Sequence, residues 1–177
     1  MRTILGKLEN EAGAEIAEAA MVLPIVFMFL LGIVWFGRAF NIYSTITQAA
    51  QQGAITAARA TCATCGASGD TFPTDLAVTG VVVAVMNSSN LDTSQILVNP
   101  NPASPSFCAN PPNTCTTTAS NIKICRNVLL NPPASTQLPQ CGAVVSFQYP
   151  FKFYLPFTAL NLEQVVLSAE AQSRMEN

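Results

Sequence analysis

Two cysteines separated by two residues, Cys62 and Cys65, are the residues of this chain that most directly suggest chemistry. A Cys-x-x-Cys spacing is typical of thiol oxidoreductases and of zinc sites. A redox motif of this kind needs a surrounding β-α-β pattern, and a zinc site needs a second close cysteine pair or histidines. The sequence contains no histidine, so structural disulfides are the favoured interpretation, with a thiol oxidoreductase using Cys62 and Cys65 as an alternative.

The missing histidine also bears on hydrolytic chemistry. Neither a Ser-His-Asp nor a Cys-His arrangement can be formed, and the sequence has no glycine-rich phosphate loop. Charged residues make up only 10% of the chain, the net charge is −2, and the basic residues form no cluster. We therefore expect no catalytic residue, no metal, no cofactor and no nucleic-acid partner.

The cysteines also indicate a compartment. All of them follow a long apolar stretch, and they are Cys62, Cys65, Cys108, Cys115, Cys125 and Cys141. An even set of cysteines in a small domain is typical of an oxidising environment outside the cytoplasm. Many connectivities are open, and pairing of sequence neighbours predicts the bonds 62 with 65, 108 with 115, and 125 with 141.

A second chemical pattern lies near the N-terminus, where Gly13 precedes Glu18 at the edge of the apolar stretch. This glycine, four residues and a glutamate form the pattern that a prepilin peptidase cuts, and glycine leaves the acyl side of the bond unhindered. Cleavage between Gly13 and Ala14 would make Glu18 the fifth residue of the mature chain. A carboxylate at the boundary of an apolar helix needs a positive partner, and the new amino group of a neighbouring subunit would provide one. The alternative is that Glu18 is an ordinary acid near a helix N-terminus, where the dipole favours it.

The apolar stretch from Ala19 to Gly37 contains no charged residue. As a helix it would be about 28 Å long, which is close to the thickness of a bilayer core. It is longer than the apolar part of a secretory signal. Arg2 and Lys7 ahead of it favour a cytoplasmic N-terminus, so we expect a single-pass membrane chain whose C-terminal domain lies outside the cytoplasm.

Periodicity predicts the remaining elements and an α+β fold. The long helix should continue to about Thr61 through alanines at steps of three and four residues, packed either on another helix or on the chain's own domain. A second helix, or alternatively a strand, is predicted over 75–88. Strands are predicted over 95–98, 122–130, 143–149 and 165–174, with Pro150 ending the third and a short connection over 156–160.

Two parts of the sequence together resemble a known family. The segment from Gly13 to Pro24, with Leu23-Pro24 inside the helix and Gly37-Arg38 after it, is similar to the N-terminus of TadE-like pseudopilins of tight-adherence (Flp-type) pilus systems. The stretches 144–150, 155–156 and 167–176 resemble the closing strands of that family. Ala19 and the acidic residues of the leader depart from its usual pattern.

The resemblance implies a structural minor pilin that is processed at Gly13 and Ala14 by a prepilin peptidase, uses Glu18 in assembly, and joins other pilin subunits through its N-terminal helix. It also implies a place in the inner membrane, with the C-terminal domain in the periplasm or outside the cell. The expected organisation is a leader over 1–13, a transmembrane and assembly helix over 14–62, and a disulfide-bonded extracytoplasmic domain over 63–177. The alternatives are the thiol oxidoreductase named above and a membrane-anchored binding domain that is never cleaved.

Overall fold

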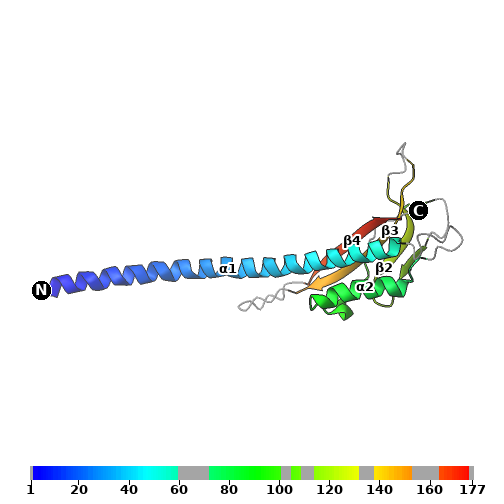
Figure 1. Ribbon diagram of the computed structural model, residues 1–177. Helices are drawn as coiled ribbons and strands as arrows, with labels where there is room; N and C mark the ends of the chain where they lie inside the picture. Colours follow the sequence, from blue (N-terminus) through cyan, green and yellow to red (C-terminus); the bar gives the residue numbers. More distant parts are fainter. Residues whose placement is uncertain are drawn as a thin grey trace. The chain divides into compact units, whose positions relative to one another are not determined.

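The computed structural model describes residues 2–59, 72–100, 105–108, 114–131, 138–152 and 164–175, with only the backbone for 2–12 and 14. Its elements are α1 (Arg2–Ala58), α2 (Asp75–Ser88), the 3-10 helix η1 (Thr93–Gln95), and the strands β1 (Thr114–Thr117), β2 (Lys123–Leu129), β3 (Cys141–Phe151) and β4 (Val165–Arg174). The chain forms two compact units, residues 1–40 and 41–177. The α+β class expected from the sequence is confirmed (Figure 1).

The first unit contains the N-terminal part of α1. The helix begins at Arg2, ahead of the expected start at Ala14, and includes Pro24 in its interior. Its large apolar side chains are exposed, including Met21 at 79% and Phe36 at 74%. This part of the helix therefore has an apolar surface that the unit itself does not bury.

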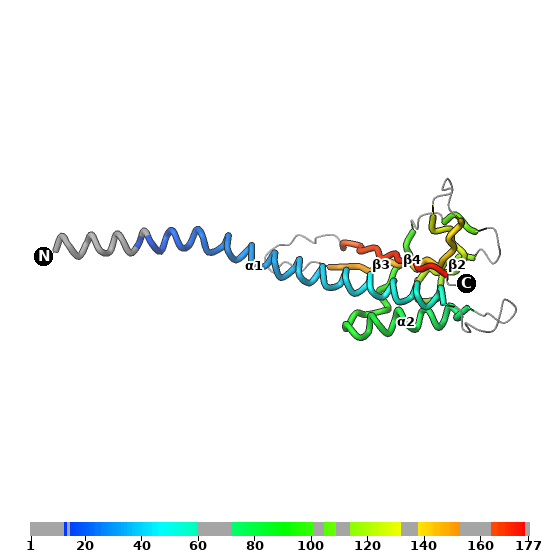
Figure 2. The backbone as a smooth tube through the Cα atoms, turned by 45° about the horizontal axis from the view of Figure 1, so that its top comes forward, coloured from blue at the N-terminus to red at the C-terminus, as the bar shows by residue number. Residues whose placement is uncertain are grey.

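The second unit is built on an antiparallel sheet whose four strands follow the order β1-β2-β3-β4. The C-terminal part of α1 and α2 lie side by side on one face of this sheet (Figures 1 and 2). The helix layer and the sheet share one core, to which the sheet contributes side chains such as Ile124, Val145 and Phe147. Residues two apart on a strand point to the same face, so the odd-numbered positions of β3 face the helices.

Helix α2 confirms the expected helix over 75–88, and the strand alternative is wrong. Its N-cap is Thr74, whose hydroxyl oxygen accepts a hydrogen bond from the amide of Ala77 at 3.3 Å. Its fully buried side chains, Val78, Val82 and Met86, recur at four-residue steps. This spacing is that of one face of a helix and not that of a strand.

The predicted strand over 95–98 is wrong. Only Gln95 of this segment lies in a regular element, as the last residue of η1, which Asp92 caps by accepting hydrogen bonds from the Ser94 amide at 3.0 Å and the Ser94 hydroxyl at 2.7 Å. Only Leu97 pairs with the sheet, through an isolated bridge to Gln148.

The predicted strands late in the chain are found as β2, β3 and β4, but Pro150 does not end β3. The Gln148 amide donates to the Leu97 carbonyl at 2.9 Å, on the side of β3 away from β4. Amides two residues apart point to the same side of a strand, so Pro150 lacks an N–H only on that side. The pairing of Pro150 with Val166 on β4 is therefore preserved.

Strand β1 was not expected, and it pairs with β2 from Thr114↔Arg126 to Thr117↔Lys123. A β-bulge follows in β2, where the pairing with β3 shifts between Arg126 and Val128. Asn127, at this bulge, has a φ of 60°. The bulge places Val128 with Cys125 and Val144 in a small cluster on the sheet face away from the helices.

The predicted connection over 156–160 lies outside the described residues.

Candidate processing and assembly site

The predicted cleavage residue Gly13 lies within α1 and is exposed. A side chain built at Gly13 would meet no atom within 4 Å, so nothing in the described chain shields this position. The backbone here is helical, and a peptidase that binds an extended strand would have to unwind it. Glycine is among the weakest helix formers, which makes local unwinding at this position less costly than at its neighbours.

The predicted assembly residue Glu18 lies five positions after Gly13 and is also exposed. It falls on a different side of the helix from Gly13, because five residues correspond to about 140° of rotation. Ala14 and Glu18 are separated by four residues and share one face. Glu18 therefore lies on the same helix face as the backbone of Ala14. The side chain of Ala14 is outside the described part.

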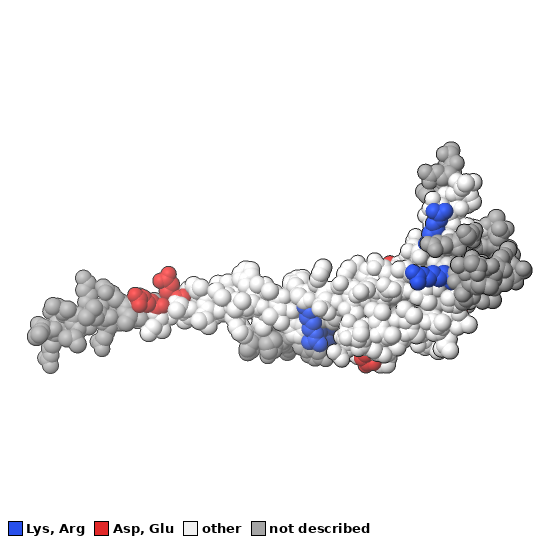
Figure 3. All heavy atoms as spheres, viewed as in Figure 1, with Lys and Arg blue, Asp and Glu red and all other residues white. Residues whose placement is uncertain are grey.

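Beyond Glu18 the surface of α1 is apolar over a membrane-spanning length. The segment Glu15–Ala58 contains a window of mean hydropathy 2.5, none of which is buried within the structure. On the face visible in Figure 3, a long uncharged surface follows the acidic side chains near the N-terminal end. Its length and exposure are those of a helix that lies in lipid or against other helices.

Gly32 makes a shallow groove on one face of this apolar segment. The side chains around it are Ile25, Met28, Phe29, Ile33 and Phe36. They recur at three- and four-residue steps and so line a single helix face. A side chain built at Gly32 would meet no atom within 4 Å, so the groove is accessible from outside the helix.

The C-terminal part of α1 has a different environment, because its alanine face packs on the chain's own domain. Ala49, Ala50, Ala54 and Ala57 are fully buried, together with Ile46. Gly53 lies in the same face, close to Val82 of α2 and Val145 of β3. Of the two expectations for these small residues, packing on the domain is confirmed. The aromatic residues Phe36 and Phe40 do not join this face and are 74% and 73% exposed.

The cysteines confirm disulfide bonding but not the pairing expected from sequence proximity. The bonds are Cys115–Cys125 and Cys108–Cys141, so the predicted pairs 108 with 115 and 125 with 141 are wrong. In the β1–β2 ladder Cys115 lies directly opposite Cys125, with 4.0 Å between their Cα atoms. The register of the two strands therefore determines which cysteines pair, and their separation along the chain does not.

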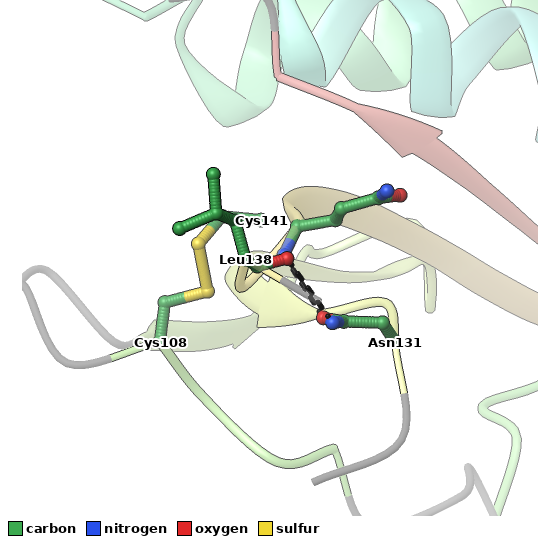
Figure 4. Close-up of a disulfide and its surroundings, with 5 residues drawn as sticks. Cys108, Asn131, Leu138 and Cys141 are labelled. Carbon is green, nitrogen blue, oxygen red and sulfur yellow. Dashed lines mark hydrogen bonds between the residues drawn. A yellow bond between two sulfur atoms is a disulfide. The ribbon is translucent and has the colours of Figure 1, made fainter. Parts of the chain in front are cut away.

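The second bond follows from the same strand order. The Cys108 amide donates to the Asn127 carbonyl at 2.9 Å, which holds Cys108 beside β2. Cys141 begins β3 opposite Leu129 of β2, so Cys108 and Cys141 meet near the same end of that strand. The Asn131 side chain holds the segment just before Cys141. Its NH₂ group donates to the Leu138 backbone carbonyl at 3.2 Å, and its side-chain oxygen accepts from the Gln140 backbone amide at 2.9 Å (Figure 4). Cys62 and Cys65 lie outside the described residues.

One polar cluster, centred on Asp75 at the start of α2, was not predicted from the sequence. The Arg126 guanidinium of β2 donates to the Asp75 carboxylate and, at 2.7 Å, to the Pro73 carbonyl. The Thr116 hydroxyl donates to the other Asp75 oxygen at 2.6 Å. Burial by itself would raise the pKa of Asp75, but the Thr116 and Arg126 hydrogen bonds and the Arg126 charge together lower it. The cluster ties the start of α2 to β1 and β2.

The described residues contain no group of three or more side chains that could hold a metal ion. In comparisons with known proteins, residues 13–54 match the family described as TadE-like protein. Neither a curated protein nor a solved structure matches the chain. The family resemblance seen in the N-terminal sequence is thereby confirmed over the segment that contains Gly13, Glu18 and the apolar helix.

Proposed function

We propose that this chain, whose N-terminal region is that of a TadE-like protein, is a structural minor pilin of a tight-adherence-type pilus. The observation that carries the proposal is the match over residues 13–54, which coincides with an exposed apolar helix of membrane-spanning length. Exposed apolar surface of this extent needs lipid or other subunits to cover it. A minor pilin has both in turn, first in the inner membrane and then in the assembled pilus.

In this proposal residues 1–13 are a leader, 14–62 are the transmembrane and assembly helix, and 63–177 are the extracytoplasmic α+β domain. A prepilin peptidase removes the leader by cutting between Gly13 and Ala14. The exposure of Gly13 and the open space around it support access to this bond. The two disulfides support an oxidising location for the domain, with the N-terminus in the cytoplasm.

Glu18 then guides assembly by pairing with the new amino group of Ala14 on a neighbouring subunit. At a separation of about 4 Å such a pair is worth on the order of 4 kcal/mol before desolvation, for an effective dielectric near 20. Desolvation cancels much of this energy. The pair therefore fixes the register between subunits more than it adds to the stability of the pilus.

The test is made in cells that assemble the pilus, by mass spectrometry of the chain and by electron microscopy of the filaments. The wild-type chain should begin at Ala14, and Gly13→Leu should leave Met1 in place. Gly37→Ala is the matched control, because Gly37 also lies in open space on α1, and it should be processed normally.

Glu18→Gln separates assembly from processing. The variant should lose its leader but fail to join the other subunits, whereas Glu15→Gln, which removes a neighbouring exposed carboxylate, should do both. An intact Met1 in piliated wild-type cells would exclude the pilin assignment. Normal incorporation of Glu18→Gln would exclude the role given to Glu18.

A further inference from the structure

We propose that Arg38, held against the ring of Trp35, binds the phosphate of a membrane phospholipid and thereby sets the depth of α1 in the bilayer. The inference rests on the membrane-spanning role proposed above. It adds a lipid site on a helix face that has no assigned partner.

The position of Arg38 along the helix is the first argument. The segment between Glu18 and Arg38 has no charged residue, and it spans about 28 Å, close to the hydrocarbon thickness of a bilayer. When Glu18 lies at one boundary, Arg38 lies at the other. Phospholipid phosphates line this boundary, so the guanidinium reaches them without being drawn into the hydrocarbon.

The second argument is that Arg38 is the only charged residue that can mark this boundary. No charged residue occurs between Arg38 and Arg59. Without Arg38 the uncharged part of the helix would extend from Ala19 to Ala58, which is far longer than a bilayer requires. The helix packs on the domain from Ile46 onward, and Arg38 is the one charged side chain that can fix the lipid boundary ahead of that part.

The third argument is the geometry of the pair. The Arg38 guanidinium carbon lies 5.9 Å from the centre of the Trp35 ring, within the range of a cation–π contact. The two residues are three positions apart and share a helix face. A guanidinium has five N–H donors, more than contact with one ring can occupy. Arg38 is exposed, so these donors are available for a bidentate contact with a phosphate.

The described residues of the first unit offer Arg38 no carboxylate within reach. Among the described residues of the first unit the carboxylates are Glu15 and Glu18, and Glu18 is about 30 Å away along the helix. Neither can neutralise Arg38 in the same chain. Trp35 is an aromatic residue of the type enriched at membrane interfaces, which places the ring and the guanidinium in the same layer as the lipid headgroups.

Trp35 is the one tryptophan in the sequence, so its fluorescence reports its own depth. The experiment reconstitutes the full chain into vesicles of phosphatidylethanolamine and phosphatidylglycerol in phosphate-free buffer. Quenching by lipids labelled at headgroup, shallow or deep positions gives the depth of Trp35. Solid-state NMR dephasing between guanidinium carbon and lipid phosphorus tests the contact itself.

Wild type should place Trp35 at the interface and show carbon–phosphorus dephasing. Arg38→Gln should lose most of that dephasing and move Trp35 deeper by about 3 to 5 Å, up to one helical turn. Arg59→Gln removes the same charge from an exposed position near the end of the same helix and should leave the Trp35 depth and the Arg38 signal unchanged.

Each contrary result has a distinct meaning. Water-like emission from wild-type Trp35 would overturn the membrane-spanning role and this inference together. A membrane-embedded Trp35 whose depth and dephasing are the same in Arg38→Gln would overturn the lipid site alone. Two further results would also overturn the lipid site, because each would show that Arg38 has another partner. Dephasing that needs added inorganic phosphate would indicate a free anion, and a depth change that depends on the protein-to-lipid ratio would indicate a second copy of the chain.

Discussion

Gly53 allows α1 to approach the domain closely, and replacing it with alanine should destabilise the fold although alanine is the better helix former. A Cβ at this position would lie 2.7 Å from Cγ2 of Val82 and 3.4 Å from Cγ1 of Val145. Val82 is fully buried, and a valine in a helix has one strongly preferred rotamer. Its methyl group therefore cannot turn away, and the helices must move apart.

The expected magnitude follows from two opposing effects. Alanine in place of glycine favours a helix by about 1 kcal/mol, whereas overpacking a filled core costs about 1 to 3 kcal/mol. Gly53→Ala should therefore lower the free energy of unfolding by up to about 2 kcal/mol. Gly80→Ala is the matched control, because Gly80 lies inside α2, is exposed, and has no atom within 4 Å of a built Cβ. It should raise the free energy of unfolding by about 1 kcal/mol.

The measurement is urea unfolding of the full chain in detergent, followed by near-UV circular dichroism of the domain. The double variant Gly53→Ala with Val82→Ala should be more stable than the sum of the single changes predicts, because the smaller side chain on α2 gives the new methyl group space. If Gly53→Ala stabilises the protein as much as Gly80→Ala does, the close packing of α1 on α2 is refuted.

Two further predictions concern the polar cluster and the disulfides. Since the pKa of Asp75 is lowered from its ordinary value of 3.8, its contribution to stability should be complete above that pH and be lost as the pH falls below it through the lowered pKa. Asp75→Asn should reduce this acid dependence in unfolding curves, and an unchanged curve would count against the Arg126 and Thr116 contacts. For the disulfides, replacing Cys108 and Cys141 by serine should cost about 3.7 kcal/mol and replacing Cys115 and Cys125 about 2.7 kcal/mol in the chain-entropy estimate, given sequence separations of 33 and 10. Non-reducing peptide mapping checks the pairs directly, and a peptide joining Cys108 to Cys115 would contradict the structure.

The sequence predicted well those elements whose hydrophobic periodicity is visible in neighbouring residues. The alternation in 165–174 places Ala169 and Ala171 in the core and leaves Ser168 and Glu170 exposed, and β4 has these bounds. The small residues of α1 likewise recur on the face that packs on the domain. The family pattern around Gly13 depends on neighbouring residues too, and residues 13–54 match it.

The errors arose where a distant segment decides the outcome. The pairing of Cys115 with Cys125 depends on the register of β1 with β2, which closeness in the chain cannot reveal. Pro150 stays in β3 because its missing N–H lies away from β4, and only the strand order shows this. The ion pair of Asp75 was not predicted, because its partner Arg126 lies on another element. Periodicity can predict which face a residue occupies, but not which residue it meets there.

The alanine face of α1 also has a mechanical consequence. Its contacts with the domain, from Ile46 to Ala57, follow one another along the helix axis. A force that pulls α1 along this axis would load them together in shear, whereas a sideways force would break them one after another. The packing on the domain should therefore resist a pull along this axis more strongly than a sideways pull.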